Sequence, residues 1–443
     1  MKIFLVSMGC AKNSVDSEYL SGTLIAHGHE VVAELDAEAS EHADVAIINT
    51  CGFIQDAVKE NIDAILDLEE LKNHGLVKKL IVAGCLVNRY ESELRKELPS
   101  VDLFVRSEEW ERVINFLNGA HNHNMQNCER SVIALNKNFW TRYLKISEGC
   151  NTLCSYCAIP LIRGRLRSVP IEKIISEAKI LCAAGARELC LVGQDLTVYG
   201  QDFSDGTNLQ GLIRELQREI PDDTWLRLFY LHPKRVDERF VDFVMSCEKV
   251  LHYLDVPIQH IDPEILSLMN RPCEPGHIER IFRYIRECDE KFALRTTIMT
   301  GFNGETDEKF DRLLDFLEEI RFDFAGTFAY SPEEGTLAAK LRKPARVGKK
   351  VANFRANKLS ELQSRISHER SELFLNHELR VLVEDIDRES GEVWGRTFRD
   401  APEIDGMTCA SSASGNISKL KPGDFVNVKI LDCEAGDLFG EIL

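Results

Sequence analysis

The sequence predicts an α/β protein in three parts: an amino-terminal domain with a parallel sheet, a central partial (β/α)6 barrel and a small carboxy-terminal antiparallel β-barrel. Three observations carry this prediction. Short apolar runs alternate with helical patterns over residues 1–118, six further strand-and-helix repeats follow over 138–370, and β-like runs separated by Gly and Asp turns occupy 371–443. The polar, non-periodic stretch 119–137 is expected to be a linker.

Length and composition agree with this division. A chain of 443 residues allows two to four domains, and 44% hydrophobic with 28% charged residues excludes a wholly disordered or fibrous protein. The chain has no run of 18 apolar residues, and its first ten residues lack the parts of an export signal. We therefore expect a cytoplasmic protein without a membrane span, in which disulfides do not account for the 14 cysteines.

The first domain alternates apolar runs with amphipathic segments, which indicates a parallel sheet covered by helices. A helix is expected over Ser14–His27, with Asn13 as its amino-terminal cap. Its strands are expected at Lys2–Ser7, Glu30–Ala33, Asp44–Asn49, Lys79–Ala83 and Asp102–Phe104.

The central domain repeats the same alternation at a spacing typical of barrels. Helical patterns such as Ile171–Ala184 and Leu209–Glu219 separate its strands, and residues 346–370 predict a long charged helix. Six repeats favour an open barrel, whose chemistry is expected at the carboxyl ends of the strands. The strands are expected at Tyr143–Ser147, Glu188–Val192, Trp225–Tyr230, Tyr253–Ile258, Ala293–Met299 and Gly326–Tyr330.

The carboxy-terminal part is short-stranded and acidic. From Phe374 onward it has 14 acidic and 7 basic residues, a net charge of −7, and the whole chain carries −18. Nucleic-acid binding depends on Lys and Arg neutralising phosphates, so this charge does not favour it. Strands are expected at Arg380–Val383, Glu392–Arg396, Phe425–Ile430 and Phe439–Ile442.

Cys150, Cys154 and Cys157 follow the first strand of the central domain with the spacing C-x3-C-x2-C. A structural zinc site usually has four ligands, commonly in two pairs. Three close thiolates without an obvious fourth fit a [4Fe-4S] cluster that leaves one iron open. A zinc site that takes a distant His or Cys as its fourth ligand remains an alternative.

Cys10, Cys51 and Cys85 each follow a predicted strand of the first domain. Open α/β sheets bind ligands at the carboxyl ends of their strands, so the three thiols are expected to converge on a second cluster. The alternative is three unrelated buried thiols. The other eight cysteines show no pattern and are expected to be packing or incidental residues: Cys128, Cys182, Cys190, Cys247, Cys273, Cys288, Cys409 and Cys433.

Polar or glycine-rich stretches follow the other strands of the central domain. All of them are expected at the same edge as the C-x3-C-x2-C triad. They are Gly193-Gln194-Asp195, His232, Gln259-His260, Thr300 to Glu305 and Tyr330 to Gly335.

These motifs resemble those of a known enzyme family. The C-x3-C-x2-C triad is similar to the signature of radical S-adenosylmethionine enzymes, and the contexts GCAKNSVDSE, NTCGF and AGC resemble the amino-terminal domain of methylthiotransferases. The tail resembles a TRAM domain. The resemblance to radical S-adenosylmethionine methylthiotransferases covers nearly the whole chain.

That family has one branch that modifies an adenosine in transfer RNA and another that modifies an aspartate of small-subunit ribosomal protein S twelve. Three stretches resemble the second branch: Val15 to Glu18, Ile258 to His260 with Met269 to Arg271, and Asp400 to Gly406. Asn303 departs from the proline that the family usually has there. The acidic tail suits a basic ribosomal protein. A transfer-RNA adenosine methylthiotransferase and a non-catalytic iron–sulfur or zinc protein remain the alternatives.

The resemblance implies a transferase with two [4Fe-4S] clusters and S-adenosyl-L-methionine. Cys150, Cys154 and Cys157 are implied as ligands of the catalytic cluster, at which one-electron cleavage of S-adenosylmethionine yields a radical that takes hydrogen from the β-carbon of the aspartate. Cys10, Cys51 and Cys85 are implied as ligands of the cluster that holds or delivers sulfur, while a second S-adenosylmethionine supplies the methyl group. The implied partners are ribosomal protein S twelve, an electron donor such as flavodoxin and a sulfur donor.

The residues expected to contact S-adenosylmethionine come from three strand ends of the central domain. They are Gly193, Gln194, Asp195, Gln259 and Gly301.

Overall fold

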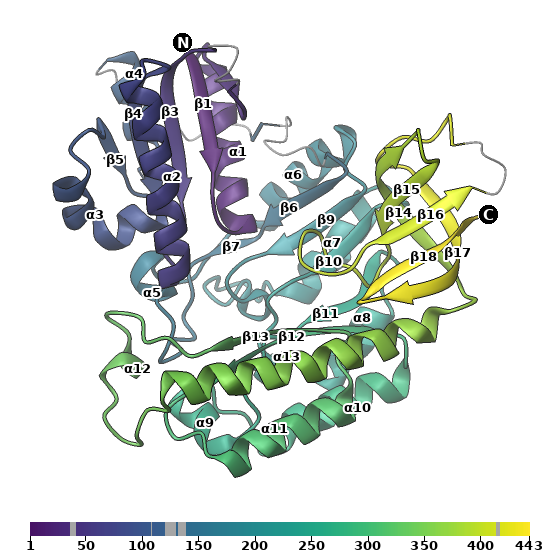
Figure 1. The fold of residues 1–443 in the computed structure, drawn as a ribbon. Coiled ribbons are helices and arrows are strands. Elements are labelled where there is room, and N and C mark those ends of the chain that lie inside the picture. The colour runs from purple at the N-terminus through teal and green to yellow at the C-terminus, as the bar shows by residue number, and fades with distance from the viewer. Residues whose placement is uncertain (36–40, 108, 120–129, 132–138, 413–416) are drawn as a thin grey trace. The chain divides into compact units, whose positions relative to one another are not determined.

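The computed structural model describes residues 1–35, 41–107, 109–119, 130–131, 139–412 and 417–443. Two compact units make up the chain, and their elements are labelled in Figure 1. The first unit consists of Met1–Phe139, Tyr143–Asn151 and Ala158–Val169. The second consists of Trp140–Arg142, Thr152–Cys157 and Pro170–Leu443.

The first unit contains a five-stranded parallel sheet in the order β2-β1-β3-β4-β5, which confirms the predicted parallel sheet. Its strands are β1 Lys2–Ser7, β2 Glu30–Val32, β3 Ala43–Thr50, β4 Val77–Gly84 and β5 Leu103–Val105. The helices between them are α1 Ala11–Ala26, α2 Gln55–Asn73, α3 Cys85–Glu97 and α4 Glu111–Asn118.

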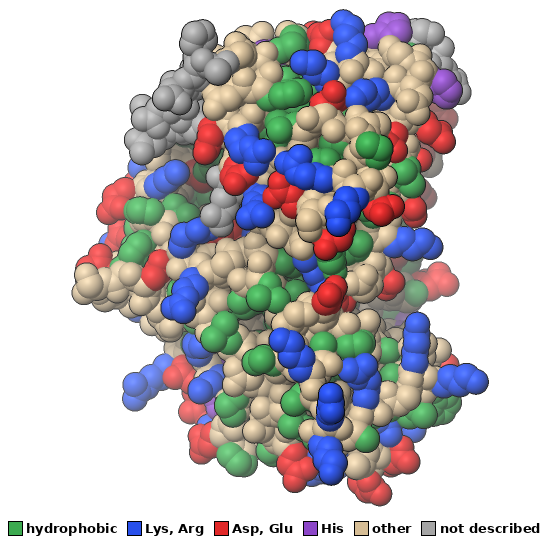
Figure 2. Space-filling model, turned by 90° about the vertical axis from the view of Figure 1, so that its left-hand side faces the viewer, with side chains coloured by type: hydrophobic (Ala, Val, Ile, Leu, Met, Phe, Trp, Pro, Cys, Tyr) green, Lys and Arg blue, Asp and Glu red, His purple; other side chains and the backbone are tan. Residues whose placement is uncertain are grey.

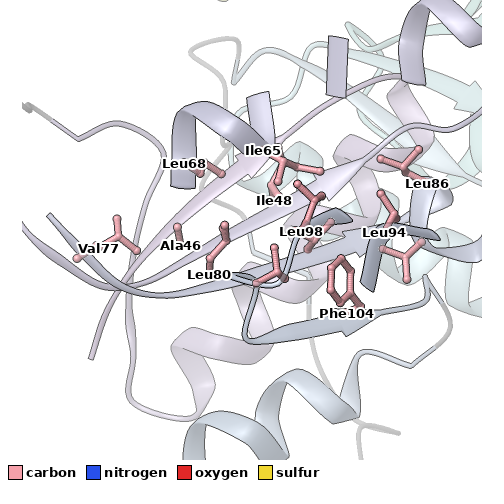
Figure 3. Close-up of a cluster of buried hydrophobic side chains, with 14 residues drawn as sticks. Ala46, Ile48, Ile65, Leu68, Val77, Leu80, Leu86, Leu94, Leu98 and Phe104 are labelled. Atoms are coloured by element: carbon pink, nitrogen blue, oxygen red, sulfur yellow. The ribbon is translucent and has the colours of Figure 1, made fainter. Parts of the chain in front are cut away.

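Apolar side chains from both faces of this sheet form its core. Ile48 and Leu80 pack with Ile65 of α2 and Leu94 of α3 in the cluster drawn in Figure 3. Burying each such side chain stabilises the fold by roughly 1.5–3 kcal/mol. The buried runs in β3 and β4 therefore explain why these strands form the centre of the sheet.

The expected cap of the first helix is wrong. Helix α1 begins at Ala11, with Cys10 in the cap position and without a side-chain cap. The side-chain amide of Asn13 instead donates to the carbonyl oxygens of Met8 and Thr50, each at 3.0 Å. An Asn amide binds backbone carbonyls outside the helix as readily as it caps, so the sequence signal was ambiguous.

The first unit also includes a short hairpin and helix that follow β6 in the chain. Strand β7 Ser147–Glu148 pairs antiparallel with β8 Arg167–Ser168, and α5 Ile159–Ile162 lies between them. The predicted linker 119–137 lies mostly outside the described residues. Within it, the buried Arg130 pairs with Glu18 and donates to the carbonyl oxygen of Tyr143 at 2.7 Å.

The second unit contains a sheet in the order β13-β12-β11-β10-β9-β6. The neighbouring strands from β9 to β13 are parallel, and the order has two ends, which confirms the predicted partial barrel. Strand β6 begins in the second unit and continues into the first. The strands are β6 Thr141–Lys145, β9 Glu188–Val192, β10 Trp225–Leu228, β11 Val250–Asp255, β12 Ala293–Thr300 and β13 Phe324–Ala329.

Helices follow these strands. The long helix α13 confirms the prediction for 346–370 and packs along β13, β12 and α11 (Figure 1). The helices are α6 Ile171–Ala183, α7 Leu209–Glu219, α8 Glu238–Met245, α9 Pro263–Leu268, α10 His277–Cys288, α11 Asp307–Ile320, α12 Leu337–Lys340 and α13 Lys349–Ser371. The 3-10 turns are η2 Leu196–Val198, η3 Pro233–Arg235 and η4 Glu372–Phe374.

The carboxy-terminal strands form a closed five-stranded barrel in the order β14-β15-β16-β18-β17. This confirms the predicted small antiparallel barrel, in which one pair departs from the pattern, because β16 and β18 run parallel. The sequence reading also missed β16, whose residues TCASS lack the hydrophobic alternation of a half-buried strand. The strands are β14 Glu378–Asp387, β15 Glu392–Arg396, β16 Thr408–Ser412, β17 Phe425–Glu434 and β18 Asp437–Ile442.

Candidate functional site

Cys10, Cys51 and Cys85 follow three neighbouring strands of the first unit. Strand β3 lies between β1 and β4, with Ser7 opposite Asn49 and Thr50 opposite Gly84. The three strands therefore end at the same level, and the three cysteines that follow them lie at the same edge of the sheet. The structure thus brings together the three cysteines that the sequence analysis grouped.

Two glycines let the backbone approach closely at this edge. Gly9 has a φ of +92°, and a Cβ added there would lie 2.6 Å from the Cβ of Cys51. Gly84 has a φ of +100°, and its added Cβ would lie 2.4 Å from the Oδ1 atom of Asn49. Any other residue would be strained at this positive φ and would collide with its neighbours. The close packing at both strand ends therefore requires glycine at positions 9 and 84.

The thiols at this edge interact electrostatically. Burial is the main reason why the pKa of Cys85 rises to about 12; Arg163 lowers this pKa, and negative charge on Cys10 and Cys51 adds to the rise. Burial also raises the pKa of Cys51. Without a bound cation the thiols of Cys51 and Cys85 stay protonated at neutral pH, and a metal centre that bonds thiolates would reverse this balance.

Arg163 is a buried cation in contact with the thiol of Cys85. Its Nε atom lies 3.0 Å from the Sγ atom of Cys85, and its Nη1 atom lies 2.7 Å from Asp16 Oδ2 and 3.0 Å from Glu148 Oε2. Lys145 pairs with the same two carboxylates. These ion pairs hold the guanidinium in one orientation, with an N–H group directed at the sulfur.

The residues of this edge fit an iron–sulfur cluster. Within the described ranges, no three His, Cys, Asp or Glu side chains are arranged to hold a single metal ion. A four-iron cube binds its cysteines through separate irons and so needs sulfurs from separate positions. Three thiols from three strand ends, with a guanidinium donor beside one of them, match that requirement.

The C-x3-C-x2-C triad lies within eight residues of the chain. Cys150 belongs to the first unit, where its N–H donates to the carbonyl oxygen of Gly164 at 3.2 Å. Cys154 and Cys157 belong to the second unit, where the N–H of Cys157 donates to the carbonyl oxygen of Cys154 at 3.1 Å. The second pair therefore sits on one tight turn.

The stretch Met269 to Arg271 supports this cysteine loop within the second unit. Arg271 is buried, and its Nη1 atom lies 3.4 Å from the Sγ atom of Cys154. The side chain of Asn270 donates to the carbonyl oxygen of Leu153 at 2.8 Å, and the N–H of Ser155 donates to that of Met269 at 2.9 Å. The stretch thus orients the ligand loop.

The five residues expected to contact S-adenosylmethionine lie at the carboxyl edge of the six-stranded sheet. Gly193, Gln194 and Asp195 directly follow β9, Gln259 follows β11, and Gly301 directly follows β12. Asp195 accepts from the hydroxyl of Thr152 at 3.3 Å and pairs with Arg235 at 3.0 Å. The sheet places these residues at one edge, and their role as cofactor contacts stays a prediction.

Among the buried polar atoms near this edge that have no hydrogen-bond partner in the described residues are Nε2 of His232 and Oε1 of Gln259. Burial lowers the pKa of His232 to about 2, helped by the charges of Arg271 and Arg235. The Nδ1 atom of this neutral imidazole accepts from the N–H of Lys234 at 3.3 Å, so Nε2 carries the proton. Such unpaired buried groups are expected where a polar ligand binds.

Sequence patterns did not reveal Arg163, and Arg271 was noted only within a stretch of resemblance; both arginines contact a cysteine sulfur. Arg163 carried a weak signal, because it is a charged residue within the apolar run Ile159 to Leu166. Asp16, in a stretch noted only for its resemblance, proves to be a partner of Arg163. Asp405, in another such stretch, accepts from the hydroxyl of Tyr253 at 2.9 Å and pairs with Arg295.

Three family models match separate parts of the chain. Residues 2–106 match the uncharacterized protein family UPF0004, residues 144–317 the radical SAM superfamily and residues 377–443 the TRAM domain. Among solved structures, the radical S-adenosylmethionine methyltransferase TsrM from Kitasatospora setae has a TM-score of 0.54 at 16% identity, covering 74% of this chain and 72% of that one. The cobalamin-dependent radical enzyme OxsB has a TM-score of 0.51 at 13% identity, covering 82% and 56%. At these identities the two structures show a shared fold.

Curated relatives match the chain from end to end. The ribosomal protein uS12 methylthiotransferase RimO of Geobacter sulfurreducens is 40% identical over 453 residues, covering 100% of this chain and 98% of its own. RimO of Aquifex aeolicus is also 40% identical, covering 99% and 97%. Since identity of this level extends through both cysteine sets and the barrel, the chain belongs to the RimO family of radical S-adenosylmethionine methylthiotransferases.

Proposed function

We propose that this transferase replaces a hydrogen on the β-carbon of an aspartate in ribosomal protein uS12 with a methylthio group, using two [4Fe-4S] clusters and S-adenosylmethionine. One observation carries the proposal: two sets of three cysteines occur in a chain that is 40% identical over its whole length to uS12 methylthiotransferases. These relatives favour the aspartate branch over the transfer-RNA alternative and over a non-catalytic metal protein.

Cys150, Cys154 and Cys157 are proposed to hold the catalytic cluster. When bound there with S-adenosylmethionine, the cluster supplies the radical chemistry that no protein side chain can perform on an unactivated C–H bond. Arg271 donates toward the sulfur of Cys154, and Asn270 holds the neighbouring carbonyl of Leu153. These residues keep the ligand loop in place and offset negative charge on the thiolates.

Cys10, Cys51 and Cys85 are proposed to hold the second cluster, which holds or delivers the sulfur. Arg163 donates toward the sulfur of Cys85 from a buried position. A charged donor makes the stronger kind of hydrogen bond to an anionic ligand, so it fits a thiolate cluster better than a free thiol.

The carboxyl edge of the six-stranded sheet is the proposed binding site of S-adenosylmethionine. Gly193, Gln194, Asp195, Gln259 and Gly301 are the proposed contacts, and the unpaired N–H of His232 is a further donor for a polar group of the cofactor. The described residues contain no helix long and apolar enough to span a membrane. We propose that the enzyme acts in the cytoplasm with an electron donor such as flavodoxin and a separate sulfur donor.

Anaerobic reconstitution tests the cofactor content. The wild type should bind about eight irons per chain, as two four-iron clusters require, and a variant with Cys10, Cys51 and Cys85 all changed to Ala should bind about four. Mass analysis of uS12 after reaction should show SCH3 in place of one hydrogen at the target aspartate. Modification of transfer RNA without modification of uS12 would favour the other branch.

Single cysteine variants separate the two sites. Cys154→Ala should abolish formation of 5′-deoxyadenosine, whereas Cys10→Ala should retain some cleavage and lose methylthiolation. Equal 5′-deoxyadenosine formation by the wild type and Cys154→Ala would contradict the proposed role of the triad.

A further inference from the structure

An exposed basic segment spans residues 340–350. Its six bases all lie at the surface, and it contains no acidic residue, in a chain where acids outnumber bases by 72 to 54. None of the six bases forms an ion pair with another described residue. In the helix that follows, the first residue with an ion pair is Arg355. Figure 2 shows Lys and Arg side chains gathered on its lower part, over α12 and the start of α13. The bases are Lys340, Arg342, Lys343, Arg346, Lys349 and Lys350.

Hydrogen bonds hold this basic segment against the loop that follows β12. The side-chain amide of Asn303 donates to the carbonyl oxygen of Pro344 at 3.1 Å, and the N–H of Gly304 donates to that of Ala345 at 3.2 Å. The same loop begins with Gly301 at the carboxyl edge of the sheet. The basic segment therefore borders the edge at which the substrate must be presented.

Asn303 is the residue that departs from the proline usual in the resembling family. Proline has no side-chain donor, so it could not make the bond to Pro344. Asn303 is fully buried, and its amide is held within this contact. In this chain, the side chain of Asn303 therefore joins the basic segment to the loop that follows β12 through a hydrogen bond.

The start of α13 carries charges that oppose helix stability. The helix begins at Lys349 after Gly348, without a side-chain cap and without an acidic residue in its first turn. Free N–H groups at a helix start favour acidic neighbours, so Lys349 and Lys350 are unfavourable there in isolation. An anion bound at this point would satisfy both the lysines and the free N–H groups.

An exposed aromatic residue lies one turn further along the same helix. Phe354 is 66% exposed and follows Lys350 by four residues, so the two share a face of α13. A basic surface next to an exposed ring is typical of proteins that bind phosphates and stack a nucleic-acid base.

We propose that the basic segment binds phosphates of ribosomal RNA and thereby orients the active edge on the assembled small subunit. This inference rests on the proposed function and adds the form of the substrate. A free, basic ribosomal protein would be repelled by this surface. The whole chain has a net charge of −18, so its surface outside the basic segment would be repelled by RNA, and the basic segment sets the orientation of contact.

Charge reversal tests the contact. Lys349→Glu/Lys350→Glu is compared with Lys59→Glu/Lys96→Glu, which makes the same change in net charge at exposed positions of α2 and α3. Acidic residues at a helix start are favourable, so the first variant is expected to fold, and Lys349→Gln/Lys350→Gln supplies a neutral intermediate. The probe is a fluorescein-labelled single-stranded fragment of small-subunit RNA, followed by anisotropy at several salt concentrations.

We expect at least tenfold weaker RNA binding for the reversed pair at α13, an intermediate loss for the Gln pair and little change for the control. Losing two phosphate contacts should also make the slope of log affinity against log salt shallower by about 1.4. Equal affinity of the wild type and the reversed pair, or an equal loss in the control, would overturn the proposal. So would loss of binding to vesicles of phosphatidylglycerol without loss of RNA binding.

Methylthiolation of two substrates completes the test. The reversed pair should lose activity on intact small subunits and keep activity on isolated uS12. Equal loss on both substrates would overturn the RNA contact as the cause. If the wild type binds RNA as expected but modifies neither substrate, the proposed function fails while the RNA contact stands.

Discussion

At the scale of single residues, a buried arginine contacts a sulfur of each proposed set of cluster ligands. Arg163 lies 3.0 Å from the sulfur of Cys85, and Arg271 lies 3.4 Å from that of Cys154. Hydrogen bonds to ligand sulfurs and nearby charge set the reduction potential of iron–sulfur clusters. These contacts therefore bear on electron transfer as well as on folding.

Arg163→Gln should lower the reduction potential of the cluster proposed at Cys10, Cys51 and Cys85, because the added electron loses a neighbouring positive charge. Each tenfold loss of electron affinity lowers a one-electron potential by about 59 mV. Electron paramagnetic resonance during a redox titration measures the shift. Arg130→Gln is the matched control, since it also breaks a buried ion pair, with Glu18, but touches no cysteine in the described residues. An equal potential in both variants would contradict this role.

Two buried histidines should make folding sensitive to acid. Burial lowers the pKa of His232 to about 2 and that of His260 to about 4, so both remain neutral in the folded chain at pH values where the unfolded chain binds protons. Above a pH of about 6.5 the neutral histidines make their full contribution to the stability of the folded chain. As the pH drops from there toward 4, the free energy of unfolding falls by about 1.4 kcal/mol per pH unit for each histidine.

Urea unfolding of the iron-free protein at pH 7, 6 and 5 measures this slope. In His232→Gln/His260→Gln the slope between pH 6 and pH 5 should be shallower by up to about 2.7 kcal/mol per pH unit, as two histidines require. The carboxylates contribute equally to the slopes of the wild type and of the double variant, so they do not affect the difference between the two slopes. Parallel slopes would show that the histidines are protonated in the folded chain.

At the scale of elements, the level ends of neighbouring strands build the first-unit site. The sequence already grouped these cysteines, because each follows an apolar strand and parallel strands end at one edge, and their role as cluster ligands stays a prediction. It did not predict the role of Asn13, whose amide joins the ends of β1 and β3 through Met8 and Thr50. That bond links residues 37 positions apart, beyond any local pattern.

Gly9→Ala should therefore lose the cluster proposed for the first unit, reducing iron from the expected value of about eight to about four per chain. The added methyl group would lie 2.6 Å from the Cβ of Cys51. Gly75→Ala is the control, because Gly75 has a φ of +77° with open space around it. It should keep its iron and lose only about 1–2 kcal/mol for the left-handed backbone. Full iron content in Gly9→Ala would mean that the strand ends can move apart.

At the scale of the whole molecule, a buried ion network joins the closed barrel to the six-stranded sheet within the second unit. Glu188 at the start of β9 pairs with Arg227 of β10 and Arg396 of β15, both at 2.6 Å, and all three side chains are buried. Arg227 also donates to the carbonyl oxygen of Phe398 at 2.8 Å. The barrel is therefore held in a fixed place on the sheet.

Glu188→Gln should destabilise the second unit by about 3 kcal/mol or more, because it leaves Arg227 buried without a carboxylate. Glu215→Gln removes an exposed pair with Arg218 and should cost less than about 1 kcal/mol. Urea unfolding of the iron-free chain measures both. A similar cost for the two variants would mean that water reaches the network.

The sequence by itself determined the fold classes of the three parts and most strands, because apolar periodicity is a local signal. Cysteine spacing and strand-end positions also let the sequence group the two cysteine sets, whose role as cluster ligands stays a prediction. It missed β16, whose polar run carries no such signal. Only the tertiary structure decided which charges meet: Arg163 reaches Asp16 across 147 positions, and Arg396 reaches Glu188 across 208. Pairing over such separations depends on how the completed sheets pack, and local patterning cannot encode it.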